Sequence, residues 1–215
     1  MKLPLSITGF LLVACAAIAQ SAPPSGEAAS AQLPQDKHDG VAISVDAYTR
    51  LDRGKEKFGK ANPLAVGILP VEVFFKNETD LPIKLKMSTI QLEVKSADGT
   101  HHQDLDWLAP VQVASAVAHP NGPSEPKMRR FPVGVGLPKD DKRDKMLEQI
   151  KPFAFDSDIL PPQATIHGFF FFDVSGQIPA PGDASLYVPD LTEATSNKTL
   201  MFFEVALTNP GGPSQ

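Results

Sequence analysis

Four consecutive phenylalanines, Phe169 to Phe172, restrict the folds open to this chain more than any other feature of its sequence. They continue a strand-like stretch that starts at Ile159. Alternate residues of a strand point to opposite faces, so aromatic side chains emerge on both sides. An exposed strand of this kind would aggregate. We therefore expect it to be buried on both sides, between a partner sheet and an inserted helix.

Alternation of apolar and polar residues predicts further strands at 41–46, 68–77, 83–94 and 200–208. Pro70 favours an edge strand or an early position in its strand. The turn residues Asn77-Glu78-Thr79-Asp80 separate the second of these strands from the third, which predicts a hairpin. The polar stretch from Arg50 to Asn62 is expected to be a connection.

The alternation changes parity within the third of these strands. Its apolar positions are odd-numbered up to Met87 and even-numbered from Ile90 to Val94. One extra residue turns every later side chain to the opposite face. The shift predicts a bulge, a bend, or a strand that leaves one sheet and joins another, and all three suit a β-sandwich. Asp98-Gly99 then supplies a turn.

The region 100–160 is less regular and predicts a helical and loop insertion between the third strand and the Phe-rich strand. Ala109 to Ala118 has weak helical character, and five prolines between 120 and 138 favour loops. A second helix is predicted from about Lys139 to Ile150, because acidic residues at its start complement the helix dipole and Pro152 stops it. We expect this insertion to cap the sheets.

The first 19 residues predict export. After Met1-Lys2, the run from Leu3 to Ala19 is apolar with few interruptions, which is typical of a secretory signal peptide. A membrane span needs roughly 20 consecutive apolar residues, so this interrupted run indicates a signal peptide rather than a span.

Two processing routes of the signal peptide remain open. Leu12 to Cys15 resembles a bacterial lipobox, with cleavage after Ala14 and acylation of Cys15, whereas Ala17-Ile18-Ala19 is an ordinary site with cleavage after Ala19.

Composition bounds the rest of the chain. Cys15 is the sole cysteine, so no disulfide can form within one chain and stability must come from the core. Residues 20–40 predict a flexible tether, 41–209 one domain and 210–215 a disordered tail. The net charge of −5 and the scattered Lys and Arg argue against a nucleic-acid surface. No second apolar run approaches the length of a membrane span, so membrane contact after export would depend on a lipid or a partner.

Several short motifs carry a resemblance. They are LPVEVFFKN at 69–77, Asp80 to Ile83, Leu160 to Pro162, Ile166 to Phe169, and Phe172-Asp173. Together they are similar to immunoglobulin-like envelope domains of bacterial lipoproteins, including the DUF4352-type group. Gln163 stands where that family has glycine, and the insertion has no counterpart there. The resemblance implies an immunoglobulin-like antiparallel β-sandwich and an exported protein, but no chemistry.

The candidate metal ligands are His101, His102, Asp104 and Asp106. Imidazoles and carboxylates together can bind a transition metal. However, adjacent histidines on an extended chain point in opposite directions, and a polar loop explains the cluster equally well. We predict no metal site and no cofactor.

Other polar residues give no catalytic pattern, and G-x-S-x-G, H-E-x-x-H and Gly-rich phosphate motifs are absent. His119 and His167 are isolated and are predicted to be surface or packed residues. Asp156 and Asp158 flank Ser157 as in a solvated loop. Trp107 is predicted to anchor a satellite core, the alternative being a stacking platform for a ligand.

Three function classes follow. We expect a non-enzymatic interaction or accessory module of the bacterial envelope, periplasmic or at the outer envelope, with an envelope protein as partner and loops 109–137 as contact surface. A carrier of small apolar ligands is the alternative, and it needs a large cavity between the sheets. A hydrolase or metal-binding protein comes third, and it needs His101 or His102 near Asp156 or Asp158.

Overall fold

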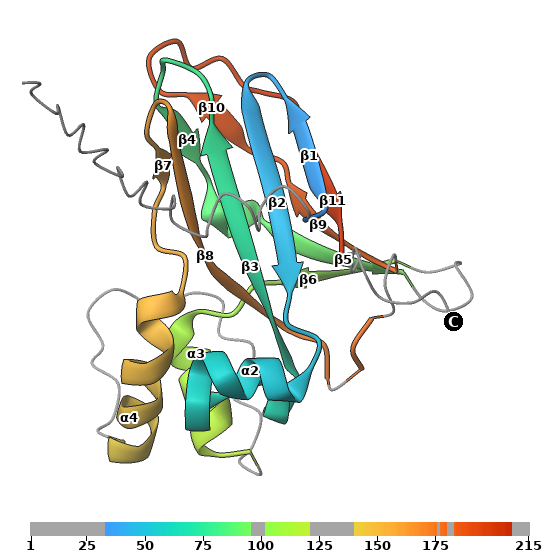
Figure 1. The fold of residues 1–215 in the computed structure, drawn as a ribbon, viewed down its shortest axis with the longest axis vertical. Helices are drawn as coiled ribbons and strands as arrows, with labels where there is room; N and C mark the ends of the chain where they lie inside the picture. Colours follow the sequence, from blue (N-terminus) through green and yellow to red (C-terminus); the bar gives the residue numbers. More distant parts are fainter. Residues whose placement is uncertain (1–32, 96–101, 121–139, 176, 180–182, 208–215) are drawn as a thin grey trace, which may run out of the picture.

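The computed structural model is mainly β with antiparallel sheets, and it describes residues 33–95, 102–120, 140–175, 177–179 and 183–207 (Figure 1). One four-stranded sheet has the order β1-β2-β3-β8 and contains β1 (Gln35–His38), β2 (Val41–Ala47), β3 (Ile68–Asn77) and β8 (Ala164–Asp173). A three-stranded sheet has the order β10-β4-β7 and contains β10 (Leu191–Glu193), β4 (Ile83–Leu85) and β7 (Ile159–Leu160). A second four-stranded sheet has the order β11-β9-β5-β6 and contains β11 (Phe203–Ala206), β9 (Ala184–Val188), β5 (Gln91–Lys95) and β6 (His102–Asp106).

The three sheets share one hydrophobic core. Val73 of β3, Ile83 of β4 and Leu186 of β9 are each fully buried in the same cluster. Alternate residues of the strands face this cluster, and the intervening residues face outward. The molecule is therefore mainly β, with antiparallel sheets facing one another across a core as in a β-sandwich.

The predicted strands at 41–46 and 68–77 are confirmed by β2 and β3, but the predicted hairpin after β3 is wrong. β3 pairs with β2 and β8, whereas β4 pairs with β10 and β7 in another sheet. Pro70 lies near the start of β3, in agreement with the early-position alternative, and β3 is not an edge strand. The apolar pattern predicted where these strands lie, but it did not predict which strands pair with each other.

The parity change marks a passage between sheets. A 3-10 turn at Met87–Thr89 separates β4 from β5, and these two strands belong to different sheets. Of the three predicted alternatives, the strand that leaves one sheet and joins another is therefore confirmed. The predicted Asp98-Gly99 turn lies outside the described residues.

The Phe-rich strand β8 is buried on both sides, as predicted. Phe170 and Phe172 belong to the core shared by the sheets, and Phe169 and Phe171 belong to a second cluster beneath the helices. The ring centre of Phe169 lies 5.0 Å from those of Tyr48 and Phe58. These edge-to-face contacts attach helix α2 (Leu51–Phe58) to the outer face of the sheet.

Helix α2 corrects the prediction that 50–62 is only a polar connection. It continues into 3-10 turns at Gly59–Ala61 and Pro63–Val66. Within α2 only Gly54 and Phe58 are buried, so its sequence is almost entirely polar. A helix with so narrow an apolar side gives little periodic signal.

The other two described helices lie within the predicted insertion and cover one end of the sheets beside α2 (Figure 1). α3 (Pro110–Ala118) and α4 (Asp141–Ile150) pack on each other, and both contribute to the second cluster. The side chain of Asp140 caps α4 by accepting from the backbone N–H groups of Lys142 and Arg143, both at 3.1 Å. A 3-10 turn at Lys151–Phe153 follows α4 directly.

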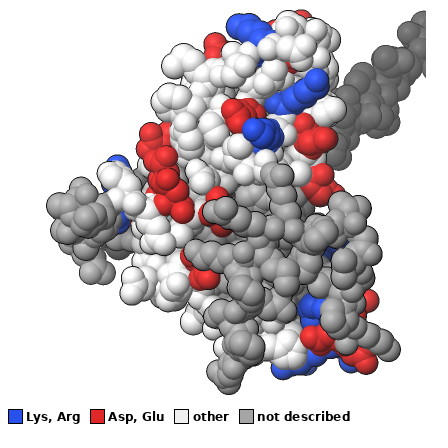
Figure 2. All heavy atoms as spheres, turned by 180° about the vertical axis from the view of Figure 1, so that it is seen from behind, with Lys and Arg blue, Asp and Glu red and all other residues white. Residues whose placement is uncertain are grey.

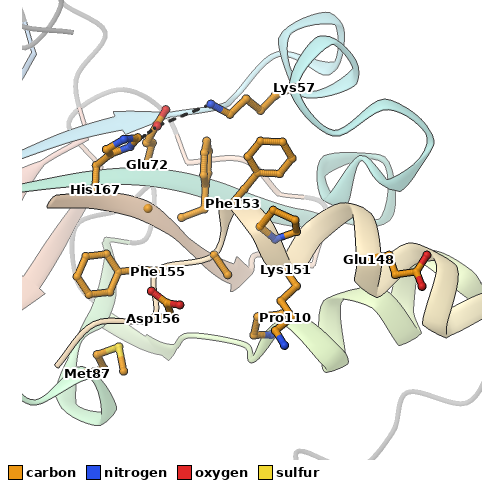
Figure 3. Close-up of a pocket in the computed structure, with 14 residues that line it drawn as sticks. Lys57, Glu72, Met87, Pro110, Glu148, Lys151, Phe153, Phe155, Asp156 and His167 are labelled. Carbon is orange, nitrogen blue, oxygen red and sulfur yellow. Dashed lines mark hydrogen bonds and ion pairs between the residues drawn. The ribbon is translucent and has the colours of Figure 1, made fainter.

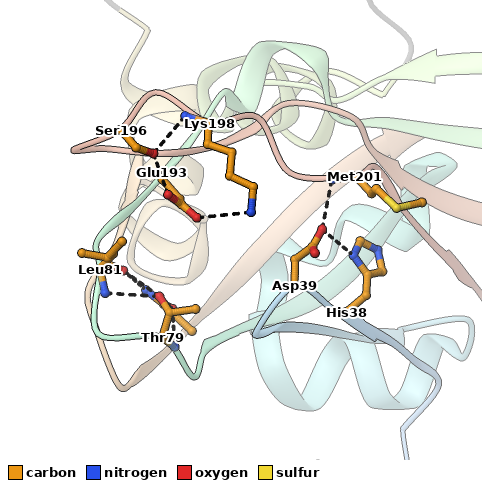
Figure 4. Close-up of polar contacts among 9 residues, drawn as sticks. His38, Asp39, Thr79, Leu81, Glu193, Ser196, Lys198 and Met201 are labelled. Atoms are coloured by element: carbon orange, nitrogen blue, oxygen red, sulfur yellow. Dashed lines mark hydrogen bonds and ion pairs between the residues drawn. The ribbon is translucent and has the colours of Figure 1, made fainter.

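The first described strand corrects the predicted tether. Residues 35–38 form β1, which pairs with β2 and lies beside β11. The ring of His38 stacks on Phe203 at 3.8 Å, and the carboxylate of Asp39 accepts from the N–H of Met201 (Figure 4). The folded region thus begins before Val41. The predicted signal peptide with Cys15, the tether up to residue 32 and the tail at 210–215 lie outside the described residues.

Besides β1, three described strands have no counterpart in the predictions, and one predicted strand is shorter than expected. β6 lies inside the region predicted to be a helical and loop insertion, and β9 and β10 were also missed. The predicted strand at 200–208 corresponds to β11, and Met201, expected to face the core, is 64% exposed. In the described ranges, no helix is long and apolar enough to cross a bilayer.

Candidate functional site

A cleft of about 770 Å³ lies where β8 meets the segment that follows α4 and the first residue of α3 (Figure 3). Aromatic and proline side chains form much of its wall, namely Phe153, Phe155, Phe169, Pro110 and Pro152. Charged side chains reach it from several elements, namely Lys57, Glu72, Glu148, Lys151, Asp156 and His167. The cleft therefore combines an apolar surface with groups of both charges.

Close packing of the backbone shapes one wall. The N–H of Phe155 donates to the carbonyl of Phe169 at 3.0 Å, which brings the chain after α4 against β8. A Cβ atom at Gly168 would lie 2.7 Å from the Cα of Phe155. Only glycine permits this approach without a shift of the backbone.

Glu72 is a buried carboxylate beside the cleft, with its side chain 8% exposed. The hydroxyl of Tyr48 donates to Oε2 at 3.1 Å, Nδ1 of His167 lies 3.0 Å from Oε1, and Nζ of Lys57 lies 3.8 Å from Oε1. The β3–β8 register pairs Phe74 with His167 and Glu72 with Phe169. This places Glu72 and His167 diagonally on one face, within reach of each other.

The neighbours of Glu72 satisfy its buried charge. A carboxylate removed from water is costly unless hydrogen bonds and opposite charges compensate it. Tyr48 is itself buried, and this burial, followed by the charge of Glu72, raises the pKa of Tyr48 to about 12. The guanidinium of Arg53 covers the Tyr48 ring at 3.9 Å and also pairs with Asp46. The hydroxyl therefore stays protonated and remains a donor to Glu72.

Lys57 extends from α2 over two aromatic rings. Its ammonium lies 5.2 Å from the ring centre of Phe153 and 5.3 Å from that of Phe169. Such cation–π contacts hold the charge at the edge of the apolar surface. Lys151, Glu148 and Asp156 are exposed and form no ion pair with any described residue. These three side chains are therefore available to a bound molecule.

The polar groups of the cleft include one imidazole. The imidazole of His167 is oriented by Glu72 and is 57% exposed, so solvent and a bound molecule can reach it. Among the 14 residues that line the cleft there is no serine, threonine or cysteine. These residues thus offer a base without a hydroxyl or thiol nucleophile.

The candidate metal ligands that the structure describes lie outside the cleft. His102, Asp104 and Asp106 alternate along one face of β6, opposite Lys95, Glu93 and Gln91 of β5. Within the described ranges no three His, Cys, Asp or Glu side chains are grouped closely enough to hold a metal ion. His101 lies outside these ranges.

The structure also places the other singled-out residues. His119, at the end of α3, contacts the Asp140 carboxylate at 2.7 Å and so joins α3 to the cap of α4. Ser157 donates to the carbonyl of Ile159 at 2.8 Å, which fixes the loop between Asp156 and Asp158. Neither aspartate contacts His102. The hydrolase hypothesis therefore lacks the juxtaposition that it required at His102.

Trp107 packs against the core shared by the sheets, not against a satellite core as predicted. Its indole N–H donates to the carbonyl of Met87 at 2.8 Å, and its ring meets the edge of Phe170 at 5.7 Å. The loops predicted as the contact surface are only partly described, because 110–118 form α3 and 121–137 lie outside the described residues.

Sequence reasoning missed the association of Lys57, Glu72 and His167. One indication was present in the sequence, because Glu72 is a charged residue that faces away from the main core within an otherwise apolar strand. The register that brings His167 beside it comes from pairing between segments 95 residues apart. No local pattern specifies such a register.

Comparisons with known proteins give no family. No family model matches the chain, and no curated protein matches it significantly. A solved structure of a functionally unknown protein from Listeria monocytogenes EGD-e has a TM-score of 0.34 and 11% sequence identity, over 81% of this chain and 80% of that chain. A likeness at this level carries no argument about function, and the resemblance to DUF4352-type domains stays a prediction.

Proposed function

We propose that this protein is a non-enzymatic interaction module whose cleft holds a segment of a partner protein. One observation carries the proposal: the cleft joins an aromatic wall to unpaired side chains of both charges, and no hydroxyl or thiol nucleophile lines it. A peptide segment matches this chemistry, because an apolar side chain can cover Phe153 and Phe155 while polar groups meet Lys151 and Asp156.

The packing of the main core supports this proposal over an apolar-ligand carrier. A carrier needs a cavity between the sheets. In the described core, the ring of Phe155 lies 5.0 Å from that of Phe75 and 5.2 Å from that of Phe170. Aromatic side chains fill the space that a ligand would need.

We further propose that the domain is immunoglobulin-like and that it acts in the bacterial envelope. The antiparallel sheets support the first part, and the apolar run 3–19 supports the second. Anchoring has two alternatives, acylation at Cys15 or cleavage after Ala19. The intact mass of the mature N-terminus distinguishes them.

Site-specific photo-crosslinking tests the proposed role of the cleft. A benzoyl-phenylalanine in place of Lys151 is expected to form a discrete adduct with an envelope protein in cells of the source organism. The same group in place of Lys198, whose side chain is 64% exposed on another part of the molecule, is the control. No adduct at 151, or the same adduct at both positions, would refute the proposal.

A further inference from the structure

The edge strand β6 offers backbone hydrogen-bonding groups to a partner. It ends the β11-β9-β5-β6 sheet and pairs with β5 alone along its length. Just after β6, Trp107 forms an isolated antiparallel β-bridge with Phe172 of β8. The N–H of Leu108 donates to the carbonyl of Phe171, also in β8. Backbone groups alternate sides along a strand, so those of His102 and Asp104 point the same way as the Leu108 N–H. In the described part of the chain, no backbone group pairs with that side of residues 102–105.

The outward face beside this edge is acidic. Asp104 lies directly opposite Glu93 of β5, and like charges at opposed positions destabilise a sheet. Burial raises the pKa of Glu93, and the neighbouring carboxylates of Glu204 and Asp104 raise it further. The rear view shows acidic side chains gathered over this part of the molecule (Figure 2). Among the described residues, His102 and Lys95 lower the pKa of Glu93, but they offset these effects only in part.

These charges decide which strand can pair with β6. A second copy joined through β6 would bring its own Asp104 and Asp106 against the same residues, and charged edges oppose such self-pairing. A strand that carries Lys or Arg at alternate positions would instead place cations beside these carboxylates. Its intervening apolar residues would face the side of Leu105, which packs against the main core.

We propose that β6 binds, by strand addition, an extended segment of a partner protein with Lys or Arg at alternate positions. This surface is separate from the cleft, because no residue of β6 lines the cleft. The proposal therefore stands independently of the proposed function.

A synthetic peptide tests this proposal. The probe is an eight-residue peptide of alternating Lys and Val, and the control peptide has Glu in place of Lys. Binding to the full protein is measured by fluorescence anisotropy, and amide hydrogen exchange locates it. The Lys peptide is expected to bind and to slow exchange at the N–H groups of His102 and Asp104, and the Glu peptide is expected not to bind.

Charge reversal supplies the matched variant. The double substitution Asp104→Lys and Asp106→Lys is expected to lower the affinity for the Lys peptide by about tenfold and to raise the affinity for the Glu peptide, because two surface charge pairs are reversed. An unchanged circular dichroism spectrum shows that the variant folds. Lys151→Glu in the cleft is expected to leave peptide binding unchanged. No binding, binding without protection of β6, or self-association through β6 would overturn the proposal.

Discussion

Glu72 shows how single residues connect stability to the candidate site. Its carboxylate is buried on the outer face of β3, and three side chains from three different elements or loops meet it. Removing one donor leaves part of a buried charge without a hydrogen bond, whereas removing the whole cluster would not. The donor from Tyr48 is the simplest to remove, because phenylalanine keeps the ring in place.

Tyr48→Phe is expected to lower the free energy of unfolding by about 1.5–3 kcal/mol at neutral pH, the range for a hydrogen bond to a charged group. Urea denaturation of the wild type and the variant measures it. Thr165→Ala, at an exposed position of β8, is the control and should change stability by less than about 0.5 kcal/mol. A Tyr48→Phe protein as stable as the wild type would contradict the role given to this hydroxyl.

The difference in stability between the wild type and Tyr48→Phe is expected to depend on pH. The pKa of Tyr48 is raised to about 12 from the ordinary 10.0, chiefly by burial. The folded protein therefore keeps this proton where the unfolded chain has lost it, and the stability contributed by Tyr48 falls as pH rises between these two values. The difference between wild type and Tyr48→Phe should shrink over this pH range. A constant difference would show that Tyr48 titrates normally.

At the scale of elements, β8 organises both hydrophobic clusters. Its even-numbered phenylalanines enter the core shared by the sheets, and its odd-numbered phenylalanines enter the cluster beneath the helices. One strand thus connects the two hydrophobic clusters. Loss of a ring on either side of β8 should therefore lower the stability of the entire domain.

Phe170→Ala is expected to cost about 3–5 kcal/mol of unfolding free energy, the range for truncating a fully buried phenylalanine. Phe202→Ala is the matched control, because Phe202 is 50% exposed and contacts Tyr187 at the surface. The control should change stability by less than about 0.5 kcal/mol. Equal losses for the two variants in chemical denaturation would contradict the assigned packing.

Elements differed in how far the sequence could predict them. β3 was predicted with its observed ends because apolar residues alternate through it, and α4 because an acidic start and Pro152 delimit it. α2 was missed because only Gly54 and Phe58 of its eight residues are buried. The cleft was missed for a different reason: strand register, set by tertiary packing, assembles Lys57, Glu72 and His167.

At the scale of the whole molecule, the helices and sheets divide their roles. The sheets enclose the main core, and the helices with the 3-10 turn after α4 supply half of the charged side chains of the cleft. The acidic face of β6 belongs to the sheets, so the two proposed surfaces can be altered independently. A cleft variant and a β6 variant are therefore expected to lose binding to different partners.

Lysine reactivity in cells tests whether a partner protein occupies the cleft. A small amine-reactive reagent is applied to intact cells of the source organism and to the purified protein, and mass spectrometry gives the extent of labelling at each lysine. Lys151 should be labelled more slowly in cells than in the purified protein, while Lys198 should react equally in both. Equal labelling of Lys151 in the two preparations would contradict the claim.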